Sequence, residues 1–318
     1  MKSLHVSLLG AVLTFTACGL GSQQSTLQDF RDAAPSAQGL SVETPWSGKS
    51  KQDLESSQQG LLGAPAFMPG VTLLSTYVVN GGVALTLQVV GSMVATDPWK
   101  LTDDSAEWGP FTQPLWRESY RLKATRDQAA YTYVLEGRPK ASTNDKDWAV
   151  LLTGTHNVTS FKAGHGIFTL DGTALNRLNP FHRLVGQAQV TYARTNKSDV
   201  TVKVAFKNAG DVDGPKADSQ YAYEQLEGGD GYFQFTAKAD YDKKSAALET
   251  FGVNSRWHDD GTGRSDVVVQ GGDIVSEVRF SECWDKALAR TYYGDTVKLF
   301  PTEGTEAACA YATASFAP

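Results

Sequence analysis

The chain has 318 residues, a formal net charge of −6 at pH 7, 41% hydrophobic residues and 30 glycines. Its length and apolar content are enough to bury a sizeable core in one large or two small domains. The acidic balance, with no run of lysine and arginine, argues against nucleic-acid binding.

The chain opens with a short apolar segment. Lys2 precedes a mostly apolar stretch of about 14 residues, Leu4 to Ala17, whereas a membrane-spanning helix needs about 20. We therefore expect residues 1–17 to be a signal peptide. The following Cys18 and Gly19 complete a segment that resembles the bacterial lipobox, which implies that Cys18 carries fatty acids, palmitate among them, as a membrane anchor. An ordinary secretory signal and a cytosolic protein with an apolar start are the alternatives.

Residues 18–63 are rich in serine, glutamine, glycine and alanine. Such polar stretches bury too little apolar surface to offset the entropy of ordering. We expect a flexible polar tether here, with local docking at residues 40–46 (LSVETPW). A single β-rich globular domain is expected over residues 64–318.

Residues 64–93 contain no charged side chain. Apolar residues recur at helical spacing from Leu73 to Val90, and Asp97-Pro98 would end a helix shortly afterwards. Asn80-Gly81 and the abundance of valine are instead typical of a hairpin. The length of the uncharged segment favours one long buried helix, and the hairpin is the alternative.

From Pro98 onward, apolar and polar residues alternate with the period of a β-strand. Tyr120, Leu122 and Ala124 share one face, and the same pattern recurs as far as Phe280. Short turn-like segments separate the runs, so consecutive strands should pair antiparallel. We predict a mainly β (α+β) fold, in which a large curved antiparallel meander or half-barrel partly wraps the long N-terminal helix.

Two further cysteines, Cys283 and Cys309, lie 309 − 283 = 26 residues apart. If Cys18 carries lipid, these two form an even set, and an extracytoplasmic compartment would allow a disulfide between them. A zinc site is disfavoured, because there is no Cys-x-x-Cys and no histidine follows His258. Two buried free thiols are the alternative.

Three short segments carry a family resemblance. They are EWGPF at 107–111, GIFTLD at 166–171 and ECWD at 282–285. With the lipobox, they resemble an uncharacterised family of predicted lipoproteins of myxobacteria-like bacteria. The resemblance implies secretion and anchoring, and it implies no activity.

No segment of the sequence predicts a reaction. The histidines at 156, 165, 182 and 258 lack metal-binding spacing, and there is no Gly-x-Ser-x-Gly nucleophile motif. The acidic turns DVDGPKAD and HDDGTGRSD could recruit calcium, but Asp-Gly is equally common turn chemistry. We therefore predict no catalytic, cofactor-binding or metal-binding residue, and a protein that is not an enzyme.

Two functions from different classes fit these expectations. The first is a structural or partner-binding lipoprotein of the cell envelope, expected at the outer membrane because Gly19, not aspartate, follows Cys18. The second is a carrier of an apolar ligand on the aromatic face of the sheet, although the same aromatic residues could simply fill the core. The residues of that face are Tyr120, Tyr131, Tyr133, Tyr192, Phe206, Phe233 and Phe235.

Overall fold

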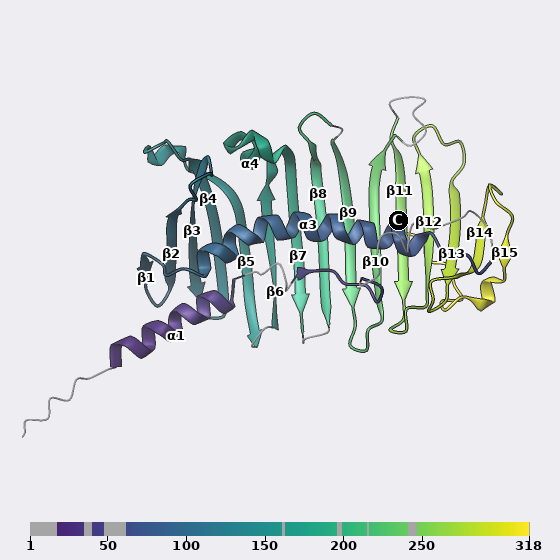
Figure 1. Cartoon of the computed structure of the whole chain (residues 1–318), viewed down its shortest axis with the longest axis horizontal. Helices are drawn as coiled ribbons and strands as arrows, with labels where there is room; N and C mark the ends of the chain where they lie inside the picture. Colours follow the sequence, from purple (N-terminus) through teal and green to yellow (C-terminus); the bar gives the residue numbers. More distant parts are fainter. Residues whose placement is uncertain are drawn as a thin grey trace, which may run out of the picture.

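The structure is a computed structural model that describes residues 18–34, 40–47, 62–160, 163–195, 199–214, 216–240 and 247–317. Within these ranges, 15 strands form one antiparallel sheet, and each strand pairs with its neighbour in the chain (Figure 1). The strands are β1 (Lys100–Leu101), β2 (Ser105–Phe111), β3 (Glu118–Asp127), β4 (Ala130–Pro139), β5 (Ala149–Ser160), β6 (Ala163–Asp171), β7 (Leu184–Arg194), β8 (Val200–Asp211), β9 (Lys216–Gln225), β10 (Gly231–Ala239), β11 (Glu249–Trp257), β12 (Gly263–Gly271), β13 (Val278–Trp284), β14 (Arg290–Asp295) and β15 (Glu303–Gly304).

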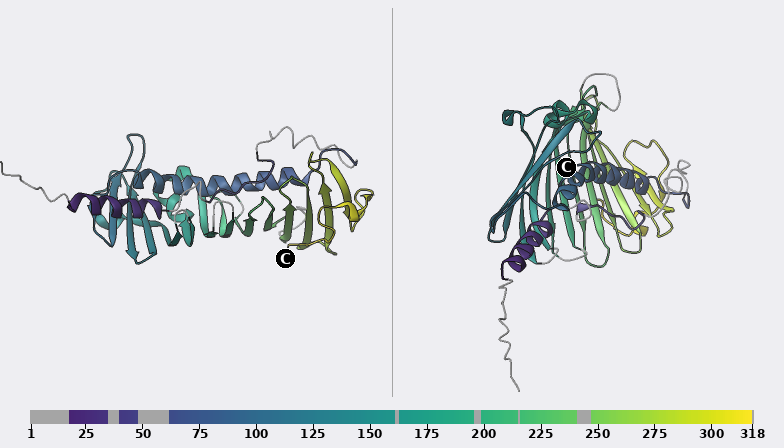
Figure 2. Two further views of the ribbon diagram at one scale, coloured as in Figure 1. Left: turned by 90° about the horizontal axis from the view of Figure 1, so that it is seen from below. Right: turned by 60° about the vertical axis from the view of Figure 1, so that its left-hand side comes forward.

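A long helix crosses this sheet on one face, as the sequence predicts. Helix α3 (Met68–Val94) is 27 residues long and runs across the strands (Figure 1). The other helical elements are α1 (Cys18–Asp32), α4 (Gly172–Leu178) and the short 3₁₀ turns η2 (Asp145–Asp147), η3 (Pro180–His182) and η4 (Glu306–Ala308). We call the face that carries α3 the inner face and the opposite face the outer face (Figure 2).

The hairpin alternative for residues 64–93 is wrong. Asn80, whose pairing with Gly81 is typical of a hairpin turn, has a different role in the structure. Asn80 lies within α3, and its side-chain amide donates to the Val42 carbonyl and accepts from the Val42 N–H, both at 2.8 Å. The asparagine therefore pairs with the backbone of a packed segment and does not form a turn.

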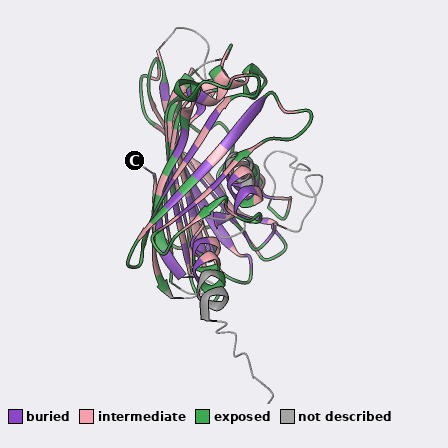
Figure 3. Ribbon diagram, turned by 90° about the vertical axis from the view of Figure 1, so that its left-hand side faces the viewer, coloured by how far each residue is buried: buried purple, intermediate pink, exposed green. Residues whose placement is uncertain are grey.

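The strand register keeps one set of side chains on the inner face throughout. Because side chains alternate along a strand, cross-strand partners lie in rows that run across the whole sheet. One inner row joins β4 to β14, and most of its members are buried. Figure 3 shows buried stretches on the strands of the sheet. Its members are Tyr131, His156, Gly166, Tyr192, Val202, Tyr223, Phe233, Ser255, Ser265, Glu282 and Tyr293.

Both edges of the sheet are short. The edge strands β1 and β15 contain two residues each. Long exposed edge strands invite pairing with other chains, so short ones limit aggregation. An open sheet of this size is thereby compatible with a discrete domain.

In the described parts of residues 18–63, helix α1 differs from the flexible tether expected there, whereas the docking expected at residues 40–46 agrees with the structure. Residues 18–32 form α1, and residues 40–47 pack on the inner face beside α3. The ring of Trp46, 2% exposed, meets Trp257 and Trp284 edge-on with centroids 5.4 and 5.8 Å apart. The segment is polar on average, but a few of its residues are apolar and complete the core. These residues are Phe30, Leu40, Val42 and Trp46.

Candidate functional site

The predicted lipid-attachment residue, Cys18, is the first residue of α1. The predicted signal peptide, residues 1–17, lies outside the described residues. Figure 1 shows α1 projecting away from the sheet, and the C-terminal half of α1 contacts β3 and β4. Lipidation of Cys18 therefore stays a prediction.

The C-terminal half of α1 is attached to the sheet by side-chain contacts. Phe30 is fully buried and meets Tyr131 edge-on, with ring centroids 5.5 Å apart. Arg31 Nε donates to the Val94 carbonyl at 2.8 Å, and Arg126 Nη1 donates to Asp29 Oδ2 at 3.0 Å. Phe30 follows Cys18 by twelve positions, a helical distance of about 18 Å. An anchor on Cys18 would thus stand close to the domain.

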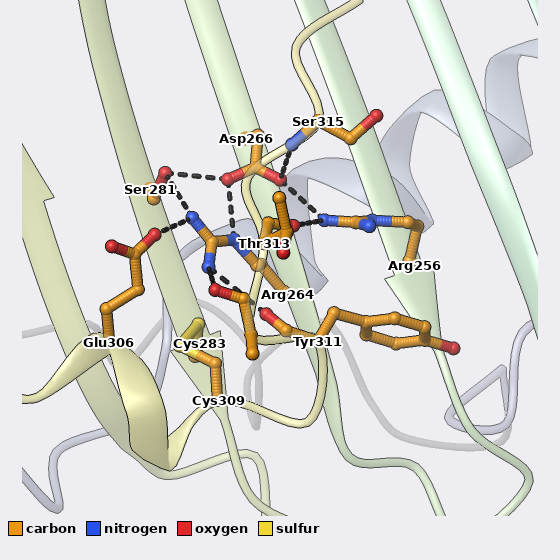
Figure 4. Close-up of a disulfide and its surroundings, with 11 residues drawn as sticks. Arg256, Arg264, Asp266, Ser281, Cys283, Glu306, Cys309, Tyr311, Thr313 and Ser315 are labelled. Atoms are coloured by element: carbon orange, nitrogen blue, oxygen red, sulfur yellow. Dashed lines mark hydrogen bonds and ion pairs between the residues drawn. A yellow bond between two sulfur atoms is a disulfide. The ribbon is translucent and has the colours of Figure 1, made fainter.

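The predicted disulfide is confirmed. Cys283 on β13 and Cys309 are joined with Cα atoms 5.5 Å apart, across a sequence separation of 26. This bond ties the C-terminal segment, residues 305–317, to the outer face of the sheet (Figure 4). We call this segment the strap.

The strap buries an ion pair on the outer face. Arg264 and Asp266 lie on β12, and the side chains of both are 0% exposed. The Nε atom of Arg264 lies 2.7 Å from Oδ1 of Asp266. Arg264 also donates to Glu306 Oε1 at 2.5 Å and to the Tyr311 carbonyl at 3.1 Å. Asp266 accepts from Ser281 Oγ at 2.6 Å. The charges are therefore buried in pairs with hydrogen-bond partners, as buried charges require.

The rest of the strap is held by aromatic and backbone contacts. The Tyr311 ring stacks on His258 with centroids 4.5 Å apart, and the Arg256 guanidinium lies 4.9 Å from the same ring. Burial raises the pKa of the Tyr311 hydroxyl to about 12, so that group stays protonated at neutral pH. Asn254 Nδ2 donates to the Ser315 carbonyl at 2.8 Å. Side chains of the sheet thus bind the strap largely through its backbone.

The structure brings the seven predicted ligand-face residues to the inner face, where the chain itself covers most of them. Five are between 1% and 7% exposed, whereas Phe206 and Phe235 are partly buried. The Tyr120 hydroxyl donates to Glu118 Oε1 at 3.0 Å, and burial together with this carboxylate raises the pKa of Tyr120. These aromatic residues act chiefly as core.

Two glycines make room for a stacked pair of rings on the inner face. His156 Nδ1 lies 2.8 Å from the Tyr192 hydroxyl, and the rings are nearly parallel. A Cβ on Gly164 would meet the His156 ring at 2.6 Å, and one on Gly166 would meet the Tyr192 hydroxyl at 2.5 Å. Burial, with a smaller effect of His165, lowers the pKa of His156. The imidazole is therefore neutral at physiological pH.

Most of the outer face lacks a comparable cover. Outward positions along the middle of β5 to β8 are exposed, and those of β9 and β10 are exposed or half-buried. A hollow of about 250 Å³ lies there across β7 to β10. It is lined mainly by amide and hydroxyl side chains, one ammonium group and small residues; the polar members are Gln189, Thr191, Lys203, Gln220, Gln234 and Thr236.

Carboxylates of the two acidic turns accept hydrogen bonds from neighbouring residues. Arg183 Nη2 donates to Asp211 Oδ1 at 2.6 Å and to Asp213 Oδ2 at 2.8 Å, and the Arg183 hydrogen bond is the main cause that lowers the pKa of Asp211. Asp260 accepts from the N–H and the hydroxyl of Thr262. In the described part of the chain, no cluster of three or more His, Cys, Asp or Glu residues could hold a metal ion.

Sequence reasoning did not identify the buried carboxylate Glu282. Glu282, 1% exposed, accepts from the Met68 N–H at the start of α3 at 2.7 Å and pairs with Arg290 Nε at 2.6 Å. Thr72 and Ser255 hydroxyls lie 2.6 Å apart beside it, and Ser255 also bonds Ser265. The sequence contained one indication of this site, because Glu282 interrupts the alternating apolar residues of β13.

The comparisons with known proteins add no family. Neither protein-family models, nor curated proteins, nor solved structures give a match to this chain. Among the helices of the described residues, none has both the length and the apolarity needed to cross a membrane.

Proposed function

We propose that this protein is a lipid-anchored lipoprotein of the bacterial envelope whose β domain is a non-catalytic partner-binding unit. The observation that carries the proposal is the contrast between the two faces. The inner face is filled by α3 and the N-terminal segment, whereas the outer face of β5 to β10 is open. A surface for a partner therefore exists on the outer face.

The inner polar groups support binding over catalysis. Glu282 is engaged by Arg290 and by the start of α3, and Ser255 is engaged by Thr72 and Ser265. A catalytic acid or base needs access to a substrate proton. These groups instead fix α3 on the sheet.

The anchor is assigned to Cys18, with the outer membrane as the expected location. We expect radiolabelled palmitate to be incorporated into the full chain expressed in a bacterium that processes lipoproteins. Cys18→Ala should abolish the label, and Cys309→Ala, which also removes one cysteine, should retain it. A full-length product without label would overturn the anchor.

A second candidate, a carrier of an apolar ligand, is favoured by one observation. The hydroxyls of Tyr133 and Tyr221, on the inner face, are buried and lack hydrogen-bond partners among the described residues. Unsatisfied buried hydroxyls cost free energy that a ligand or water could recover. Titration of the full chain with a dansylated fatty acid tests this. A saturable increase in fluorescence that is weaker in the Tyr133→Phe variant would support the carrier.

A further inference from the structure

The strap and the hollow lie side by side in the same rows of the outer face. Gln234 and Thr236, which line the hollow, pair across strands with Asn254 and Gly252. Asn254 binds the strap, and Ala317 of the strap lies against Gly252. The hollow is thus continuous with a surface that already binds an extended chain.

The strap demonstrates how this face recognises a polypeptide. Side chains that point outward donate to three successive parts of its backbone. Arg264 Nη1 donates to the Tyr311 carbonyl at 3.1 Å, Arg256 Nη2 to the Thr313 carbonyl at 2.8 Å, and Asn254 Nδ2 to the Ser315 carbonyl at 2.8 Å. Backbone recognition of this kind needs donors at strand spacing and little sequence specificity.

The hollow offers the same chemistry without a cover. The amides of Gln189, Gln220 and Gln234 can each donate to a carbonyl and accept from an N–H. Ala205 and Ala222 lie between them at outward positions. Alanine is depleted in strands, so sheet formation does not favour it at these positions. Its small side chain lets another backbone approach the sheet.

The size and charge of the hollow indicate what fits. At about 250 Å³ it is smaller than a typical small-molecule pocket, for which about 300 to 1,000 Å³ is usual. Lys203 stands in it as an exposed cation with no ion pair among the residues that the structure describes. An extended segment with an acidic side chain would match both features.

We infer that the hollow across β7 to β10 binds an extended segment of a partner protein, with an acidic side chain of that segment over Lys203. This inference rests on the proposed function as a partner-binding unit and names the chemistry of the partner. The three glutamines hold the backbone, the alanines allow its approach, and Lys203 selects charge.

Binding of the full chain to immobilised ten-residue peptides tests the inference. Three libraries built on small residues would carry two glutamates, two glutamines or two lysines. The glutamate library should bind about threefold tighter than the glutamine library, and Lys203→Gln should remove that preference. The double variant Ala205→Gln with Ala222→Gln, which fills the hollow, should weaken binding about tenfold. Thr132→Gln, at an exposed outward position of β4, is the matched control and should bind as the wild type does.

Two results would overturn the inference. One is equal binding by the wild type and the filled variant. The other is that no peptide library binds, whereas an acidic oligosaccharide, oligogalacturonate, binds the wild type and not the filled variant. The hollow would then be a glycan site. Peptide binding is measured away from membranes, so it is independent of palmitate labelling. Failure of the anchor and failure of this site are therefore distinguishable.

Discussion

The two faces of the sheet are covered by elements of opposite character. The inner face meets α3, a 27-residue helix with no charged side chain, and a cluster of aromatic rings. The outer face near β12 meets the strap, which is held by a disulfide, an ion pair of Glu306 with the buried Arg264, and hydrogen bonds to its backbone. The inner cover depends on removing apolar area from water, whereas the strap depends on polar geometry and one covalent bond.

The contrast between the two covers indicates which face can bind a partner. A face filled with interdigitated apolar side chains has no room for a partner unless the fold opens. A polar face binds a chain without opening, as the strap shows. Substitutions on each face distinguish the two kinds of cover.

The largest effect is expected from the inner aromatic cluster. Trp257→Ala removes a ring that is 1% exposed, and we expect the free energy of unfolding to fall by about 4 kcal/mol. Urea denaturation measures this. Trp99→Ala, at a side chain that is 66% exposed, is the control and should change stability by less than about 0.5 kcal/mol. Equal losses in both variants would show that the inner face is not the main core.

The ion pair under the strap should come next. Asp266→Asn removes the buried carboxylate beside Arg264 and leaves that guanidinium only the half-exposed carboxylate of Glu306, so we expect a loss of about 3 kcal/mol in the free energy of unfolding. The Asp103→Asn variant serves as comparison, since Asp103 is an exposed residue between β1 and β2. A loss for Asp266→Asn no larger than that for Asp103→Asn would contradict the assigned burial.

Removal of the disulfide should act selectively on the strap. The double variant Cys283→Ala with Cys309→Ala should lose about 2 to 3 kcal/mol of stability. Hydrogen exchange should accelerate in residues 306–317 and stay slow in the described backbone of α3. Treatment of the wild type with dithiothreitol should reproduce the pattern. Equal acceleration in α3 and the strap would mean that the two covers are not independent.

The smallest expected effect is a pH dependence from His156 on the inner face. Because burial lowers the pKa of His156, the unfolded chain takes up this proton first as pH falls. The neutral imidazole contributes its full stability above the ordinary pKa of about 6.5, and that contribution is lost as pH falls through the lower pKa of the folded state. The difference in melting temperature between the wild type and His156→Gln should therefore narrow from pH 7.5 to pH 5. A constant difference would place the imidazole in solvent.

Much of the fold could be predicted from the sequence, because its signals are local. Period-two alternation identified the strands, and the uncharged segment identified α3, whose bounds differ by a few residues from the expected 64–93. The cysteine count identified the pairing of Cys283 with Cys309. The predicted aromatic set lies on the inner face as expected, since alternation fixes which side each residue takes.

The rest could not be predicted, because it depends on contacts between distant parts of the chain. The packing of Trp46 on Trp257 and Trp284 joins residues about two hundred positions apart, and no local pattern encodes it. The burial of Arg264 depends on a strap that reads as an ordinary terminal loop. The hollow beside it arises from the side-by-side register of β7 to β10, which places Ala205 and Ala222 among longer side chains.

Native mass spectrometry of the full chain carrying Cys18→Ser tests most directly whether the inner face is filled by the protein itself. We expect a single species at the mass of the polypeptide, because α3 and the N-terminal segment occupy that face. A reproducible additional mass of one lipid molecule, lost on unfolding, would show that the inner face holds a ligand and would contradict the account.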